Sequence, residues 1–201
     1  IGDGGSCVVY KASLSSLSGA LCAVKVLSSE ADEWENKQFA AEVAILTRVR
    51  HPNLVRFYGS STDGPQKCLV LECMHSALDK RLVADDKPKL SWQQMLKIAI
   101  EVCRALVYLH GLDPPMIHRD VKSQNVLLVG FESSTLDDDS VAKVADFGTV
   151  REDTRNTDGK LRTSAQTHAS TQRVVGTKPY IAPEYSRKGH VSEKTDAYSL
   201  G

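Results

Sequence analysis

The residue types best suited to chemistry gather in residues 117–125, Ile-His-Arg-Asp-Val-Lys-Ser-Gln-Asn, and in residues 146–148, Asp-Phe-Gly. The first stretch places Asp120, Lys122 and Asn125 within six positions. A carboxylate and a carboxamide provide the hard oxygen ligands that Mg²⁺ prefers. The spacing therefore predicts a loop that holds charged and polar groups in a fixed geometry.

Two short apolar runs, at residues 115–117 and 126–129, flank this loop. Runs of this length and composition are typical of buried β-structure, which can anchor a polar loop at both of its ends. We expect the loop to be rigid for this reason.

Residues 117–125 and 146–148 resemble the H-R-D-x-x-x-x-N and D-F-G elements of protein kinases. The resemblance implies transfer of the ATP γ-phosphate, a reaction that depends on positioning and on neutralising phosphate charge. By this resemblance, Asp120 would accept or orient the proton of the substrate hydroxyl, and Lys122 would steady the transferring phosphate. Asn125 and Asp146 would hold Mg²⁺, with Mn²⁺ as an alternative.

Residues 2–12 resemble the kinase glycine-rich loop G-x-G-x-x-G-x-V, with Gly2, Gly4 and Val9 at matching positions. Glycines allow backbone N–H groups to approach phosphates closely. Cys7 stands where the pattern has its third glycine. We expect this side chain to stiffen the turn and to weaken phosphate contact without changing the fold.

A lysine lies inside an apolar strand pattern at residues 21–27. A buried charge costs free energy unless it has a partner. Residues 34–50 carry apolar side chains at helical spacing and include Glu42, so the kinase resemblance predicts an ion pair between Lys25 and Glu42. Lys25 would then reach the α- and β-phosphates of ATP.

Further strand patterns at residues 51–59 and 67–73 complete a predicted antiparallel five-stranded sheet with one helix. By resemblance, the hinge that holds the adenine edge falls on Glu72, Cys73 and Met74. Leu71 would be the gatekeeper residue. The candidates for the apolar walls of the ATP site are Ile1, Val9, Ala23, Leu71 and Leu127.

Helical patterns dominate the second half of the chain. Ser91 is a candidate N-cap for a helix that continues to about His110. We expect its core-facing side to consist of Trp92, Met95, Ala99, Val102, Cys103, Leu106 and Leu109. Residues 130–140 form an insertion that we interpret as a solvated acidic loop rather than a divalent-ion site.

A helix is also predicted from Ser192 onward, and by resemblance its Asp196 would hydrogen-bond the backbone around His118 and Arg119. These predictions define an α+β, bilobal protein kinase fold. Residues 1–73 would form the N-lobe, and residues 74–201 would form an incomplete, mainly helical C-lobe.

Residues 146–184 correspond to the activation segment of the family. In protein kinases, the residue at the position of Arg119 receives a phosphorylated side chain of this segment, because guanidinium pairs bidentately with phosphate. An upstream kinase, or the protein itself in trans, would add this phosphate. Ser170 and Thr171 are our first choices among Thr163, Ser164, Thr167, Ser170 and Thr171.

Residues 176–184 resemble the G-T-x-x-Y-x-A-P-E element that seats a peptide substrate. Lys122 and Thr177 follow the serine/threonine pattern, and we also place Thr177 among the regulatory residues. The closest similarity is to the tyrosine-kinase-like group, which includes receptor-like and interleukin-receptor-associated kinases. A pseudokinase scaffold, a tyrosine or dual-specificity kinase, a small-molecule phosphotransferase and a non-catalytic truncation product remain alternatives.

The composition limits the other classes of function. The 201 residues include 25 basic and 25 acidic side chains, so bulk charge predicts binding to neither nucleic acid nor an anionic membrane. Five scattered cysteines indicate a reducing compartment. We therefore expect a cytoplasmic domain whose partners are ATP and a protein with Ser or Thr acceptors. The start inside a motif and the stop at Gly201 lead us to expect a fragment truncated at both ends, belonging to a longer parent that a membrane anchor could hold.

Overall fold

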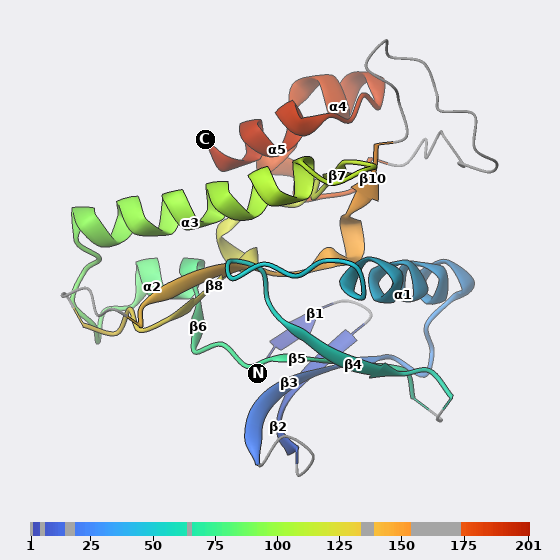
Figure 1. Ribbon diagram of the computed structural model, residues 1–201, viewed down its shortest axis with the longest axis horizontal. Helices are drawn as coiled ribbons and strands as arrows, with labels where there is room; N and C mark the ends of the chain where they lie inside the picture. Colours follow the sequence, from blue (N-terminus) through green and yellow to red (C-terminus); the bar gives the residue numbers. More distant parts are fainter. Residues whose placement is uncertain (1, 5–6, 15–18, 64–65, 134–138, 154–173) are drawn as a thin grey trace.

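The computed structural model describes residues 2–4, 7–14, 19–63, 66–133, 139–153 and 174–201. Ile1, Ser170 and Thr171, together with the other candidate phosphate acceptors Thr163, Ser164 and Thr167, lie outside these residues. Figure 1 shows a β-sheet at the bottom, one helix above it on the right, and a group of helices farther up.

The N-terminal part is a five-stranded antiparallel sheet in the order β1-β2-β3-β5-β4. Its strands are β1 (Gly2–Gly4), β2 (Cys7–Leu14), β3 (Ala20–Leu27), β4 (Phe57–Ser61) and β5 (Cys68–Glu72). The predicted sheet with one main helix is therefore confirmed.

The helix of this part, α1 (Glu33–Leu46), begins with a capping box in which Asp32 and Glu35 satisfy each other's backbone N–H groups. The helix ends four residues earlier than predicted. Thr47 is its C-cap, and the chain then turns toward Pro52, whose ring disfavours helical geometry at the residue before it.

The second part is mainly helical, and its helices are α2 (Leu78–Val83), α3 (Trp92–His110), α4 (Pro183–Lys188) and α5 (Glu193–Leu200). Two small antiparallel sheets lie among them. One contains β6 (Ser76–Ala77), β8 (Val126–Val129) and β9 (Val141–Val144), and the other contains β7 (Met116–Ile117) and β10 (Arg151–Glu152). Short 3₁₀ turns cover Ser123–Asn125, Phe147–Thr149 and Lys178–Tyr180.

Ser91 caps α3 as predicted, but the predicted core-facing side of this helix is partly wrong. Trp92, Met95, Ala99 and Cys103 are exposed. The buried side chains are Gln94, Ile98, Glu101, Val102, Ala105, Leu106 and Leu109. Apolar spacing missed this stripe because two of its members are polar: the Glu101 carboxylate accepts from the backbone N–H of Ala142, and Gln94 donates to the carbonyl of Ser133.

Contacts with α2 and α3 modify our interpretation of the insertion at residues 130–140. Phe131 is buried, and the buried Arg81 donates to its carbonyl oxygen. The described ends of the insertion are therefore anchored to α2 and α3, although we expected a solvated loop.

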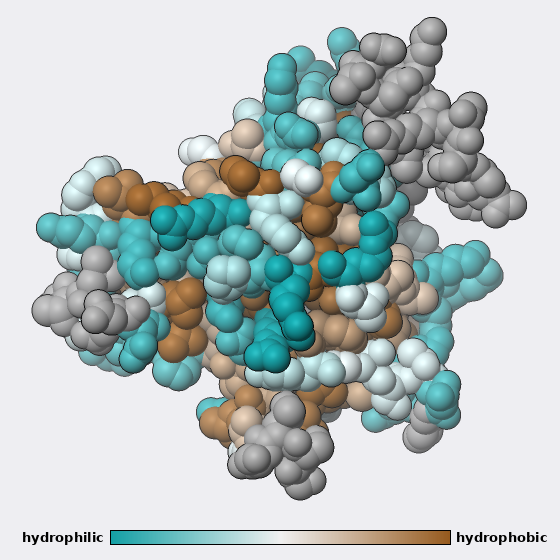
Figure 2. All heavy atoms as spheres, in the orientation of Figure 1, coloured by the Kyte–Doolittle hydropathy of each residue, from teal (hydrophilic) through white to brown (hydrophobic). Residues whose placement is uncertain are grey.

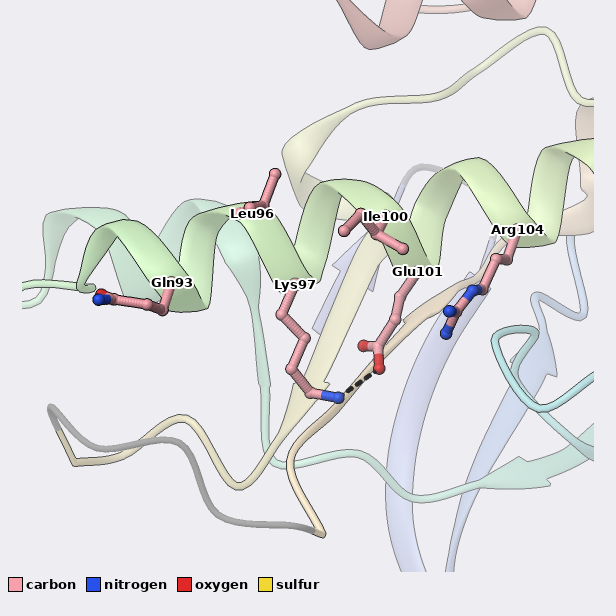
Figure 3. A pocket seen from close by; sticks show the side chains of 6 residues that line it. All are labelled: Gln93, Leu96, Lys97, Ile100, Glu101 and Arg104. Carbon is pink, nitrogen blue, oxygen red and sulfur yellow. Dashed lines mark hydrogen bonds and ion pairs between the residues drawn. The ribbon is translucent and has the colours of Figure 1, made fainter.

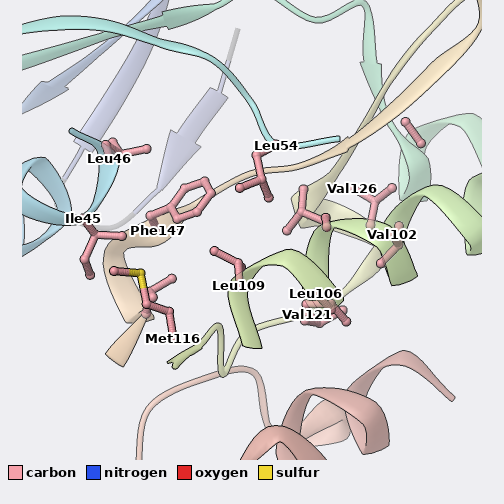
Figure 4. Close-up of a cluster of buried hydrophobic side chains, with 14 of the residues drawn as sticks. Ile45, Leu46, Leu54, Val102, Leu106, Leu109, Met116, Val121, Val126 and Phe147 are labelled. Atoms are coloured by element: carbon pink, nitrogen blue, oxygen red, sulfur yellow. The ribbon is translucent and has the colours of Figure 1, made fainter. Parts of the chain in front are cut away.

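One apolar core connects the two parts of the molecule. Figure 4 shows Ile45 and Leu46 of α1 close to Phe147, with Leu109 of α3 and Met116 nearby. Figure 2 shows polar residues over much of one face, with apolar patches between them. The continuous core fixes the position of the residue 146–148 turn relative to α1.

Candidate active site

The loop between β7 and β8 holds Asp120 at the centre of a hydrogen-bond network. Asp120 is 5% exposed. Its Oδ2 lies 2.7 Å from Nζ of Lys122 and accepts from Nδ2 of Asn125 at 3.0 Å. Its Oδ1 accepts from both the backbone N–H and the hydroxyl of Thr177, each at 2.9 Å. The structure thus brings together four residues that the sequence placed in two separate patterns.

Asp196 of α5 holds the backbone of this loop through hydrogen bonds. Its fully buried carboxylate accepts from the backbone N–H of His118 at 2.8 Å and of Arg119 at 2.7 Å, which confirms the predicted contact. His110 adds a third hydrogen bond at 2.8 Å. Arg119 has a left-handed backbone with φ of 68°, and such strain persists when surrounding contacts hold it.

Gly176 makes the contact between this loop and the segment that carries Thr177. Its φ is +116°, and a Cβ atom at this position would lie 2.7 Å from the carbonyl oxygen of Arg119. Only glycine avoids both the steric clash and the unfavourable backbone conformation. The two segments are therefore in direct backbone contact.

The second charged network joins the sheet to the Asp-Phe-Gly turn. Nζ of Lys25 lies 2.9 Å from Oε2 of Glu42 and 3.2 Å from Oδ1 of Asp146. The predicted ion pair between Lys25 and Glu42 is therefore present. Val9 lies opposite Lys25 in the register of β2 and β3, so both side chains share one face of the sheet.

The charges in this network shift one another's titration. Burial opposes protonation of Lys25, but the carboxylates of Asp146 and Glu42 outweigh it and raise the Lys25 pKa. Burial likewise acts to raise the pKa of Asp146, and the positive charge of Lys25 overcomes it, so that this pKa is lowered. The two groups are therefore both charged at neutral pH.

Asn125 and Asp146 have donor atoms suited to a divalent cation. The amide nitrogen of Asn125 donates to both the backbone carbonyl and the carboxylate of Asp120, which leaves its carbonyl oxygen as the ligand atom. The Asp146 side chain is 42% exposed. Within the described residues, no cluster of three His, Cys, Asp or Glu side chains could hold a metal by itself. Two oxygen ligands completed by nucleotide phosphates fit Mg²⁺ better.

The predicted residues of the ATP site lie on several strands. Register places Val9, Ala23, Lys25 and Leu71 on one face of the sheet. Gly2 and Gly4 pair with Val9 and Cys7 at the hairpin of β1 and β2. Met74 follows β5 and is half-buried, and Leu127 lies on β8.

Glu72 has a side-chain partner that the sequence did not reveal. Its carboxylate contacts Nζ of Lys143 on β9 at 2.7 Å and accepts from the backbone N–H of Arg56. The side chain thus links β5 of the large sheet to the strand that leads to Asp146. The expected adenine contact involves only hinge backbone groups, so this pairing is compatible with it.

The predicted phosphate receptor, Arg119, is engaged within the described residues. Its Nε donates to the carbonyl of Thr149 at 2.5 Å, and one terminal nitrogen lies 3.4 Å from the Tyr185 hydroxyl. Burial lowers the pKa of the Arg119 guanidinium. Tyr185 also accepts from the backbone N–H of Val175 and was not predicted from sequence. Its position directly after the A-P-E sequence was the available signal.

A surface pocket on α3 provides a contrast to this site. Figure 3 shows its lining side chains, Gln93, Leu96, Lys97, Ile100, Glu101 and Arg104, all from one helix. Lys97 is paired with Glu101 at 2.7 Å. The pocket contains none of the residues predicted to bind nucleotide or metal.

The protein kinase domain profile matches residues 1–201, which is the whole chain. The chain belongs to the protein kinase domain family. Its relatives in Arabidopsis thaliana include a probable LRR receptor-like serine/threonine-protein kinase (38% identical), the cysteine-rich receptor-like protein kinase 27 (41%) and the proline-rich receptor-like protein kinase PERK13 (38%). Each alignment covers all of this chain, but only 18%, 29% and 26% of the respective relative.

This kinase domain therefore spans less than a third of the length of these relatives. Its α+β fold with an antiparallel N-terminal sheet agrees with the family assignment. In the part of the chain that the structure describes, none of the helices has the length and apolar character needed to cross a bilayer.

Proposed function

We propose that this kinase domain transfers the γ-phosphate of ATP to Ser or Thr hydroxyls of a protein substrate. The observation that carries the proposal is the bridging position of Lys25, whose ammonium contacts both Glu42 and Asp146. This contact connects the sheet, α1 and the Asp-Phe-Gly turn. Phosphoryl transfer requires cations and oxygen ligands in fixed positions around the phosphates.

Each residue has a specific role in this proposal. Asp120 orients the acceptor hydroxyl and takes up its proton, while Lys122 steadies the transferring phosphoryl group and Lys25 holds the α- and β-phosphates. Asn125 and Asp146 hold Mg²⁺, with Mn²⁺ as an alternative. The bound cation would neutralise charge on the β- and γ-phosphates.

The contacts of Thr177 support a Ser/Thr rather than a Tyr acceptor. Its hydroxyl lies 2.9 Å from Oδ1 of Asp120 and 2.7 Å from Nζ of Lys122. The three groups form a compact unit, which favours an acceptor hydroxyl on a short side chain. We infer that a tyrosine ring would require this unit to be rearranged.

Regulation by phosphorylation of the activation segment is part of the proposal. Arg119 would exchange its present contacts with Thr149 and Tyr185 for a phosphate on Ser170 or Thr171. An upstream kinase or a second copy acting in trans would add the phosphate. Unchanged phosphotransfer in the Ser170→Ala, Thr171→Ala double variant, after complete autophosphorylation, would reject this assignment.

We further propose a role in signal transduction on the cytoplasmic side of a membrane-anchored parent. The support for this is the printed names of the relatives, which describe receptor-like kinases. The five free cysteines agree with a reducing compartment.

The experiment that tests the activity is transfer of labelled phosphate from Mg-ATP to a generic basic protein by the full chain. The Asp120→Asn variant provides the blank. Label on Ser and Thr that disappears in the variant supports the proposal. Binding of ATP without transfer would instead indicate the pseudokinase alternative, for which Cys7 in the glycine-rich loop is the supporting feature.

A further inference from the structure

Gln38 of α1 makes a direct contact with the Asp-Phe-Gly turn that the proposed mechanism does not use. Its Nε2 donates a hydrogen bond to the carbonyl oxygen of Gly148 at 2.8 Å, across 110 positions of sequence. Gln38 is half-buried and lies one helical turn before Glu42. The same face of α1 therefore contacts the turn through two side chains.

Three side chains surround Gly148 at ordinary van der Waals distance. A Cβ atom at Gly148 would lie 3.4 Å from Oε2 of Glu42, 3.5 Å from Oδ1 of Asp146 and 3.8 Å from Nε2 of Gln38. The carbonyl oxygen of Gly148 accepts from Gln38, and the carboxylates of Glu42 and Asp146 lie near its Cα. The residue is thus in contact with both carboxylates that pair with Lys25.

Asp146 needs this support because its backbone is strained. Its φ is 65°, a left-handed conformation that a residue with a side chain adopts at a cost in free energy. Such a conformation persists only when neighbouring contacts hold it. Lys25 holds the carboxylate and the core holds Phe147 (Figure 4). Gln38 holds the carbonyl that follows.

We propose that Gln38 is a positioning residue that fixes the orientation of Asp146 through the Gly148 carbonyl. This inference rests on the proposed kinase function, in which Asp146 binds the divalent cation. An amide is suited to the task because it donates a hydrogen bond without adding charge. A carboxylate at position 38 would face a carbonyl oxygen and would also repel Glu42 at i+4.

Two substitutions of nearly the same size test the role of the donor. Gln38→Met removes the hydrogen bond, and Gln38→Glu replaces the donor with a charged acceptor. The matched controls are Gln93→Met and Gln93→Glu on the exposed surface of α3, far from this turn in sequence. All variants are made in the full chain.

Two measurements report on the contact. The first is steady-state kinetics with varied Mg-ATP and varied free Mg²⁺. We expect about tenfold lower kcat/KM for Gln38→Met, consistent with the loss of one hydrogen bond. Gln38→Glu should lose more, with a raised half-saturating Mg²⁺ concentration. The second is amide hydrogen exchange of residues 147–150 without nucleotide, which should become several-fold faster in both variants while the melting temperature changes little.

The controls separate this inference from the proposed function. Exchange and kinetics of the Gln38 variants equal to those of the Gln93 variants would overturn the positioning role while leaving the kinase activity established. If the unaltered chain transfers no phosphate, the proposed function fails, and the positioning role of Gln38 is then tested by hydrogen exchange alone. Exchange rates at residues 147–150 that are the same in the Gln38 variants and in the Gln93 variants would overturn the inference.

Discussion

The two charged networks of the site are built in different ways. Around Asp120, two of the partners, Lys122 and Asn125, belong to the same nine-residue stretch, and Asp196 fixes the backbone below them. Around Lys25, the partners lie 17 and 121 positions away, on α1 and in the Asp-Phe-Gly turn. The first network takes two of its side-chain partners from its own loop and a third, Thr177, from a segment 57 positions away, whereas both partners of the second come from other elements.

This difference has a consequence for regulation. Contacts within one loop keep their geometry as long as the loop is folded. The Lys25 network breaks whenever α1 or the residue 146–148 turn moves, because each contributes only one of the two carboxylates. The loop of residues 117–125 therefore depends more on its own residues, and in the proposed function a movement of α1 or of the turn would change the Lys25 side of the site.

The largest expected effect comes from the network around Asp120. Asp120→Asn should lower kcat by about 10³-fold or more, since in the proposed function it removes the carboxylate that takes up the hydroxyl proton, while the shape of the side chain is kept. Phosphate transfer to a protein substrate measures the loss, and thermal unfolding provides the control. Substantial residual transfer with a normal melting temperature would contradict this role.

A substitution in the network around Lys25 should lower both the activity and the stability. Lys25→Met leaves Glu42, which is 4% exposed, beside Asp146 with no cation between them. We expect a loss of about 3 to 5 kcal/mol in the free energy of unfolding. Denaturant titration measures it, and Lys37→Met, which removes an exposed lysine of α1, serves as the control. Equal stability of the two variants would show that the pair contributes no more than a surface contact.

Asp196→Ala tests whether the loop that holds Asp120 depends on the hydrogen bonds from its backbone to Asp196. The substitution leaves the backbone N–H groups of His118 and Arg119 without their acceptor. The expected destabilisation is about 2 to 3 kcal/mol, because unsatisfied buried donors are costly. Asp196→Asn retains a carbonyl acceptor and should lose less. If both variants are as stable as the unaltered chain, the loop does not need this carboxylate.

The smallest effect is expected at the link between β5 and β9. Lys143→Met breaks a contact with Glu72, whose side chain is 25% exposed, so that its carboxylate can be hydrated when the cation is removed. The free energy of unfolding should fall by about 1 kcal/mol, and kcat should change by no more than about threefold. Denaturant titration combined with kinetics measures both. A loss as large as that in Lys25→Met would show that this link, too, controls the geometry of the site.

The contrast between local and distant contacts also explains what could be predicted from sequence. The sheet, the capped helix α3 and the grouping of Asp120, Lys122 and Asn125 in one loop follow from short patterns, whereas the contact between Asp120 and Thr177 does not. The contact of Gln38 was missed because its partner is the backbone carbonyl of Gly148, and a backbone carbonyl carries no sequence signal. The contact of Lys143 was missed because its partner, Glu72, is distant in sequence. The wrong face of α3 has a related cause, since Gln94 and Glu101 are buried by hydrogen bonds rather than by apolar character.

The close approach of Gly176 to the Arg119 carbonyl adds a final consequence. Gly176 directly precedes Thr177, so a side chain at position 176 would force the Thr177 segment away from the loop that holds Asp120. In the proposed function, the alignment of a bound peptide with Asp120 would therefore depend on the absence of a side chain at this position.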